Sequence, residues 1–143
     1  MEIVSYHHLP AGQTPSPMRG SQPFKAVVVI EQDVTPDWQA RVSEWLVRSG
    51  CRYMMAWGRA CSSWDDSVDE ANLAAFDFGD IPDESFVMTT WHEGEPLEEV
   101  FWFAEHAAIH PMMELTRTII VHITANAREV ELLGAFQRAQ RGG

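Results

Sequence analysis

The sequence predicts a single three-layer α/β domain in which a mostly parallel sheet of four strands, or five, carries helices on both faces. Between residues 23 and 141, short apolar segments alternate four times with amphipathic segments, and the changes coincide with proline, glycine or capping residues. Such alternation is typical of parallel sheets with crossover helices. The length of 143 residues and the 45% hydrophobic content suit one hydrophobic core.

The first 22 residues are expected to form a loose or edge-lying extension. They hold three prolines, two glycines and many small polar residues, which favour turns over regular structure. Residues 3–6 (IVSY) could still add a fifth strand. The domain itself is therefore predicted over residues 23–141.

The first strand is predicted over residues 24–30, whose continuous apolar character indicates burial on both faces. A helix follows, because Thr35 offers an N-cap hydroxyl, Pro36 suits the first helical position and Gly50 suits the C-terminal stop. Residues 52–57 are predicted as the second strand.

The middle of the chain predicts another helix and strand. Ser63 and Asp66 match a capping box, which predicts a helix over residues 64–75. A turn-rich segment follows, and residues 85–91 are predicted as the third strand.

The last elements are a helix, a strand and a final helix. Pro96 is expected near the start of the third helix, and Pro111 is expected to end it. Residues 118–124 are predicted as the fourth strand. Asn126 and Glu129 match a second capping box at the start of the last helix.

The functional surface is expected beyond the carboxyl ends of the strands, as in flavodoxin-like and Rossmann-like sheets. No glycine-rich fingerprint follows any predicted strand, so neither a dinucleotide site nor a phosphate loop is supported, and no cofactor is expected. The residues that follow the strands and are expected to share one rim are Glu31, Asp33, Trp57, Arg59, Cys61, Thr90, Trp91, His92, Thr124 and Asn126.

Acidic residues are concentrated in one region of the chain. Residues 60–116 contain fourteen of the 21 acidic residues and no lysine or arginine. The rest of the chain therefore has seven acidic and ten basic residues and is nearly balanced in charge. With a pI near 4.8, binding to nucleic acid or to an anionic membrane is disfavoured, and a basic protein partner or a cation is favoured. First-turn positions in helices account for four of the fourteen. The acids that form the candidate docking face include Asp69, Asp77, Asp80, Asp83 and Glu84.

Tryptophans strengthen the binding hypothesis. Trp57, Trp64 and Trp91 are predicted at the ends of elements beside acidic residues. Tryptophan surrounded by polar residues is enriched among interface hot spots. The first hypothesis is therefore a non-catalytic binding protein whose acidic, aromatic surface engages a basic protein partner.

A catalytic alternative uses Cys61 as the nucleophile of a hydrolase or transferase. His92 would act as its base, and Asp65 or Glu93 would orient the imidazole. A helix N-terminus favours a thiolate, but the surrounding carboxylates raise a thiol pKa. Because of this conflict, binding ranks above catalysis.

A metal-binding alternative uses histidine. His106 and His110, four residues apart in the predicted third helix, could share one face toward a metal ion, and His92 is a further candidate ligand. His122 lies within an apolar strand and is predicted to be a satisfied core histidine instead.

The two cysteines, Cys51 and Cys61, are too few for a disulfide framework, and no segment has the pattern of a signal peptide or the length of a membrane span. A reduced, cytoplasmic location is therefore expected.

Several motifs resemble small, uncharacterised bacterial α/β domains of unknown function. The resemblance rests on Ala56-Trp57-Gly58, Cys61, Trp64-Asp65 and Thr89-Thr90-Trp91-His92-Glu93, and it would cover residues 24–124. It implies the fold but no activity. In composition alone, the chain is also similar to toxin-neutralising immunity proteins.

Overall fold

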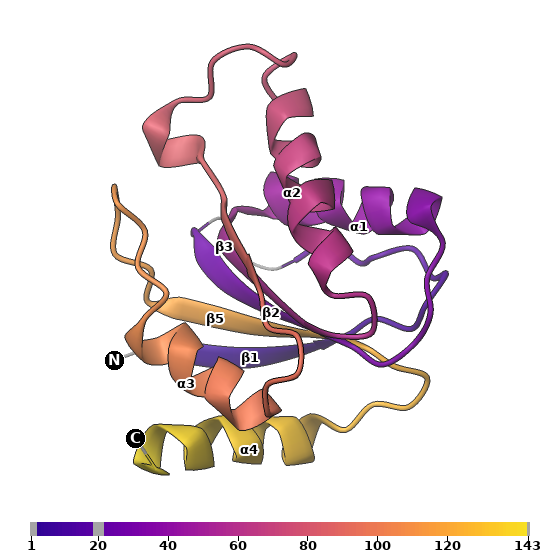
Figure 1. Ribbon diagram of the computed structural model, residues 1–143, viewed down its shortest axis with the longest axis vertical. Coiled ribbons are helices and arrows are strands. Elements are labelled where there is room, and N and C mark those ends of the chain that lie inside the picture. Colours follow the sequence, from indigo (N-terminus) through magenta and orange to yellow (C-terminus); the bar gives the residue numbers. More distant parts are fainter. Residues whose placement is uncertain (1–2, 19–21, 143) are drawn as a thin grey trace.

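The computed structural model describes residues 3–18 and 22–142, which form a five-stranded sheet with two helices against each face (Figure 1). This confirms the predicted α/β class, with the fifth strand present. In chain order the elements are β1 (Ile3–His8), β2 (Phe24–Ile30), α1 (Pro36–Ser49), β3 (Cys51–Gly58), α2 (Ser62–Ala74), the short helical turn η1 (Asp83–Ser85), β4 (Met88–Trp91), α3 (Leu97–His106), β5 (Arg117–Ile123) and α4 (Glu129–Gly142).

The strand order is β1-β5-β2-β3-β4, and all four neighbouring pairs are parallel. The last strand in the chain thus lies between the first two, and β1 and β4 form the edges. The chain leaves β2 toward α1 on one face and leaves β5 toward α4 on the other. The carboxyl ends of β2 and β5 therefore form the topological switch point, where sheets of this class commonly bind ligands.

The N-terminal extension is an edge strand followed by a loop against α1. The strand runs to residue 8, two residues beyond the apolar segment that suggested it. In the loop, the carbonyl of Gln13 accepts a hydrogen bond of 2.8 Å from the Trp38 indole of α1. Residues 1–2 and 19–21 of the predicted extension lie outside the described residues.

Two hydrophobic clusters lie on opposite faces of the sheet. Alternate residues of β2 point to opposite sides, so Val28 joins the cluster that includes α1 and α2 while Val27 joins the one that includes α3 and α4. Figure 1 shows α1 and α2 above the sheet and α3 and α4 below it. Because both faces are covered, every residue of β2 is buried, as its continuous apolar sequence predicted.

The predicted caps were right for α1 and wrong for α2. Thr35 accepts a hydrogen bond of 3.2 Å from the backbone of Trp38, and Gly50 ends α1 in a left-handed conformation with φ of 106°. In α2, Ser63 lies inside the first turn and donates its hydroxyl to the carbonyl of Ala60 at 2.8 Å. It is therefore helical already and does not cap the helix.

Helix α3 ends at His106, five residues before Pro111, which the sequence had predicted as its end. The buried ammonium of Lys25 donates to the carbonyl of Ala104 at 2.5 Å, and the backbone N–H of Ala108 turns to the carbonyl of Phe103 instead. If the helix continued, the carbonyl of Ala104 would accept from the backbone N–H of Ala108. It accepts from the Lys25 ammonium instead, and the helix ends at this point.

Helix α4 begins later than the capping box predicted. The backbone N–H of Leu132 bonds to the carbonyl of Arg128, which places the helix start after Asn126. Leu132 and Phe136 of this helix are buried, whereas Val130 is 87% exposed.

Candidate functional site

The carboxyl ends of the strands form a rim, as predicted, with β2 and β3 closely joined. Gly58 adopts φ of 109°, and a Cβ at this position would collide with the carbonyl oxygen of Ile30. The next backbone N–H, that of Arg59, donates to the same carbonyl at 2.9 Å, and the Arg59 guanidinium pairs with Asp33 at 3.2 Å. Close approach at a glycine therefore holds this part of the rim together.

The rim does not assemble a Cys61–His92 pair. Cys61 is buried in the cluster that includes α1 and α2. The ring of His92 instead packs against Phe103 of α3, with ring centroids 4.9 Å apart. Its Nε2 lies 2.9 Å from the hydroxyl of Thr90 and its Nδ1 lies 3.2 Å from the carboxylate of Glu95. Both ring nitrogens are therefore engaged away from the thiol.

Electrostatics also disfavour Cys61 as a nucleophile. Burial is the largest influence on the Cys61 thiol and raises its pKa; the backbone hydrogen bond from His92 lowers the pKa by a smaller amount, and the Glu93 carboxylate adds a still smaller increase. The acids expected to orient the imidazole do not do so, because Glu95 occupies that position and Asp65 groups with other carboxylates on α2. The predicted catalytic set Cys61, His92, Asp65 and Glu93 is therefore not brought together.

His92 instead joins the end of β4 to the start of α3. With Glu95 accepting from Nδ1–H, Nε2 accepts the hydroxyl proton of Thr90, which fixes the tautomer. The indole of Trp57 also donates to the backbone carbonyl of Glu95 at 2.6 Å. His92 is only 6% exposed, so this chain of hydroxyl, imidazole and carboxylate acts as a brace in the turn.

A second polar cluster, the switch-point cluster, consists of Tyr6, Glu31, His122 and Arg128. The backbone N–H of Arg128 donates to the Tyr6 hydroxyl at 3.0 Å, and that hydroxyl in turn donates to Nδ1 of His122 at 2.7 Å. Nε2 of His122 then donates to Glu31, which also pairs with the Arg128 guanidinium. His122 is fully buried and has both nitrogens bonded, as the sequence predicted for it.

The charges within the switch-point cluster compensate one another. Burial tends to raise the pKa of Glu31, but hydrogen bonds from His122 and Arg128 lower it below its usual value. Burial lowers the pKa of His122 despite the opposing effect of Glu31. A neutral imidazole thus lies between a phenol and an ionised carboxylate, and the members of the cluster bond one another.

The predicted histidine pair for a metal is not formed. Because α3 ends at His106, His110 lies beyond the helix and shares no helical face with it. The ring of His106 packs against Trp102, with centroids 4.8 Å apart. His110 donates from Nε2 to the carbonyl of Phe86 at 2.7 Å and accepts at Nδ1 from the backbone of Met112 at 3.1 Å, so both nitrogens are used in a turn.

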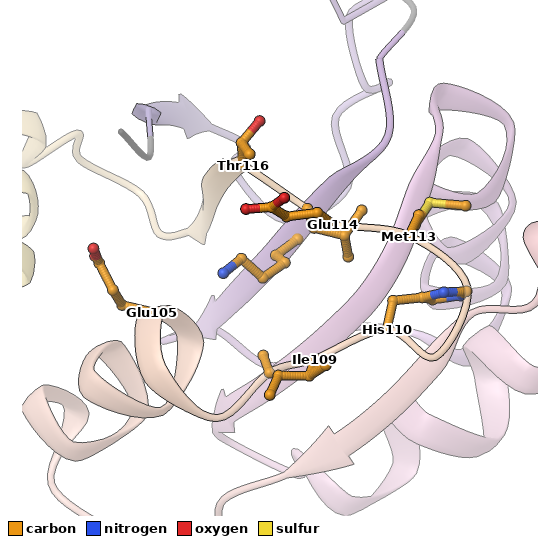
Figure 2. Close-up of a pocket in the computed structure, with 9 residues that line it drawn as sticks. Glu105, Ile109, His110, Met113, Glu114 and Thr116 are labelled. Atoms are coloured by element: carbon orange, nitrogen blue, oxygen red, sulfur yellow. The ribbon is translucent and has the colours of Figure 1, made fainter.

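A cavity of about 400 Å³ lies at the amino ends of β2 and β5, away from the rim. Figure 2 shows Glu105 at the end of α3, with Glu114 and Thr116 on the segment that leads into β5. Lys25 forms part of the lining and is already bonded to the end of α3. This cavity thus adjoins the lysine that ends the helix.

The edge groove is an apolar cavity of about 310 Å³ between α2 and β4. Asn72 holds its wall in place, because its side chain donates to the carbonyl of Ser85 at 3.1 Å and accepts from the backbone N–H of Val87 at 3.0 Å. The groove is lined by Asp69, Asn72, Leu73, Ile81, Phe86, Val87, Met88 and Thr89.

The carboxylate of Asp69 lines the edge groove, and those of Asp65 and Asp66 lie close to it on α2. Burial raises the pKa of Asp69, against a lowering by the hydroxyl of Thr89, and the carboxylates of Asp65 and Asp66 raise it further. Carboxylate oxygens of these three aspartates lie within 4.8 Å of one another, the one such group with three or more metal-binding side chains in the described parts of the chain. The acidic shoulder, as we name the predicted docking acids, consists of Asp69, Asp77, Asp80, Asp83 and Glu84.

Apolar side chains are exposed beside these acids. Leu73 is 40% exposed and Phe86 43%, and both line the edge groove. The segment between α2 and β4, which carries every residue of the acidic shoulder except Asp69, projects from the top of the molecule as viewed in Figure 1. Arg52 of β3 donates to the backbone carbonyl of Glu84 at 3.1 Å, so the side-chain carboxylate of Glu84 takes no part in that hydrogen bond.

Of the three tryptophans predicted as anchors, one is well exposed. Trp64 is fully buried in the core and cannot contact a partner, which corrects the prediction. Trp57 is half-buried and bonded to Glu95, whereas Trp91, at the end of β4, is 48% exposed. The sequence misses Leu73 and Phe86, because helical and strand patterns do not reveal which apolar side chains lie at a sheet edge.

The fold and the groove define a three-layer α/β domain with an acidic, partly apolar sheet edge. The family model described as a domain of unknown function (DUF7684) matches residues 4–139, and the chain belongs to that family. No curated protein and no solved structure matches the chain. Over the described residues, no helix has the length and apolar character needed to cross a membrane.

Proposed function

We propose that the protein is a non-catalytic binding protein that engages a basic protein partner through the edge groove and the acidic shoulder, as an immunity protein or stoichiometric inhibitor would. One observation carries the proposal: an apolar cavity of about 310 Å³ is lined by the half-buried Asp69 and by the exposed apolar side chains of Leu73 and Phe86, and the chain segment next to it carries the exposed shoulder acids. Apolar anchors within a charged rim favour tight contact, and complementary charge speeds encounter.

The backbone of the shoulder supports the proposal. Asp77 and Phe78 adopt left-handed conformations with φ of 53° and 60°, and Phe78 is 65% exposed. Such a conformation costs roughly 1–3 kcal/mol for a bulky residue and persists where other constraints require it. An exposed aromatic side chain held in this way is suited to contact a partner.

The geometry does not favour the two alternative functions, a cysteine-dependent enzyme and a metal-binding protein. A hydrolase or transferase based on Cys61 and His92 needs a thiol and an imidazole in contact, but both ring nitrogens of His92 bind other groups. A metal site based on His106 and His110 needs a shared helical face, but α3 ends at His106.

We also propose that the protein acts in the cytoplasm, where thiols stay reduced. Cys51 and Cys61 are both free and buried. To test this, the thiols of the protein are alkylated in whole cells before purification, and the alkylated cysteines are counted. Cysteines that escaped alkylation because they were already oxidised in the cell would contradict the proposal.

The binding function can be tested by reversing charge at the shoulder. Immobilised wild type and the variant Asp80→Lys/Asp83→Lys/Glu84→Lys are exposed to native lysate at low ionic strength, and retained proteins are quantified. We expect basic proteins that the wild type retains to be lost from the variant and to elute with salt. Asp37→Lys/Glu99→Lys/Glu129→Lys is the matched control, with the same change in net charge at exposed sites elsewhere, and it should retain them. Identical retention by both variants, or none by wild type, would contradict the proposal.

A further inference from the structure

Strand β4 presents unpaired backbone groups at the edge of the sheet. The backbone N–H of His92 donates to Ala56 of β3 at 2.9 Å. Because backbone direction alternates along a strand, the groups of Thr90 also face β3, whereas those of Thr89 and Trp91 face outward. Across the described residues, no backbone hydrogen bond engages these two outward N–H groups.

The outward edge of β4 is continuous with the edge groove. Val87, Met88 and Thr89 line the groove and lead directly into the outward-facing part of the strand. Two residues before Thr89, the backbone N–H of Val87 already donates a hydrogen bond to the side-chain oxygen of Asn72. The open stretch of edge therefore begins at Thr89, beside an apolar cavity and next to Asp69, whose carboxylate accepts a hydrogen bond from the Thr89 hydroxyl.

We propose, resting on the binding function above, that the partner contributes an extended basic segment that adds a sixth strand beside β4. Its backbone would pair with Thr89 and Trp91, one row of its side chains would enter the edge groove, and its lysines or arginines would lie against the acidic shoulder. Addition of a strand to a free edge is an established mode of peptide recognition.

The chemistry of the edge favours this occupant over others. A helix bonds its own backbone and offers nothing to the outward groups of Thr89 and Trp91. A second copy of this chain carries the same net charge of −11 and would place one acidic shoulder near another. A basic strand satisfies the backbone, the cavity and the charge together.

Proline substitution at Thr89 separates backbone pairing from side-chain effects. Thr89→Ala removes the hydroxyl bond to Asp69 but keeps the N–H, whereas Thr89→Pro removes both. Because this N–H points away from β3, proline leaves the pairing inside the sheet intact, as proline does in natural edge strands. The probe is a fluorescein-labelled octapeptide of alternating lysine and valine, measured by fluorescence anisotropy.

We expect Thr89→Ala to bind this peptide, and Thr89→Pro to bind it about tenfold more weakly, from the loss of one hydrogen bond and the steric effect of the ring. Two further peptides are N-methylated, one on every valine and the other on every lysine. In a strand, residues of one set point their N–H groups to the same side. One methylated peptide should therefore lose binding while the other keeps it, although their charges are equal.

The outcomes distinguish this inference from the function on which it rests. Equal binding by both methylated peptides, or no binding by the parent peptide, would overturn strand addition. The methylated pair leaves the protein unaltered, so it decides the question even if Thr89→Pro unfolds the chain. A wild-type dimer that Thr89→Pro converts to a monomer in sedimentation velocity would assign the edge to a second copy and also overturn the inference. The binding function fails separately, if charge reversal at the shoulder leaves partner retention unchanged.

Discussion

The switch-point cluster and the acidic shoulder both gather ionisable side chains, but they do so in opposite ways. In the first, Glu31 is bonded by His122 and Arg128, and His122 is fully buried. In the second, Asp80, Asp83 and Glu84 are exposed. Polar groups that bond one another stabilise a fold, whereas charges left open to solvent are available to a partner. For this reason the proposed binding surface lies at the sheet edge, although the switch point is where sheets of this class usually bind ligands.

The largest expected effect is on the switch-point cluster. His122→Ala should lower the free energy of unfolding by about 2–4 kcal/mol, because it leaves the hydroxyl of Tyr6 and the carboxylate of Glu31 without their shared partner and opens a cavity. Urea denaturation followed by circular dichroism measures this. A loss below about 1 kcal/mol would show that the cluster does little for stability and would weaken the contrast with the shoulder.

The pH dependence of stability should also come partly from the switch-point cluster. Burial lowers the pKa of His122, so the unfolded chain takes up its proton first, and stability should fall as pH drops below about 6.5. The lowered pKa of Glu31 acts in the same direction at lower pH. Its contribution to stability is lost as pH falls through the pKa of Glu31 in the folded protein, which lies below the ordinary value of 4.5.

Urea denaturation between pH 7.5 and pH 5.5 checks the histidine contribution. His122→Gln should have a flatter pH dependence than wild type. Some slope should remain in His122→Gln, because burial also lowers the pKa of His7. Equal slopes for wild type and His122→Gln would refute the assignment.

The smallest expected effect on stability is at the acidic shoulder. Asp80→Lys/Asp83→Lys/Glu84→Lys should change the free energy of unfolding by less than about 0.5 kcal/mol, because none of these side chains forms an ion pair in the described residues. Thermal and urea denaturation give the value. A loss of about 2 kcal/mol or more would mean that the carboxylates support the fold, and that their exposure is no evidence for a partner.

The sequence predicted those parts of the fold that depend on neighbouring residues. The strand at residues 24–30 and the helix from Thr35 to Gly50 were identified from local patterns, and both are present. The end of α3 could not be predicted, because it depends on the bond from Lys25 to Ala104, 79 residues away in the sequence. The position of β5 between β1 and β2 is likewise a matter of long-range pairing.

The candidate site was predicted in part. The carboxyl-end rim and the acids of the shoulder followed from strand order along the chain and from composition. The hypothetical pairing of Cys61 with His92 failed because two residues at the same rim can face opposite sides of the sheet. The edge groove was missed because the exposure of Leu73 and Phe86 depends on β4 being an edge strand, which local sequence does not reveal.

The most direct test of the central claim compares protein retention by wild type, by the shoulder variant Asp80→Lys/Asp83→Lys/Glu84→Lys and by the matched control Asp37→Lys/Glu99→Lys/Glu129→Lys, with all three shown to be folded. We predict that wild type and control retain the same basic proteins and that the shoulder variant loses them. Retention of those proteins by the shoulder variant at the wild-type level would contradict the assignment of this surface to a basic partner.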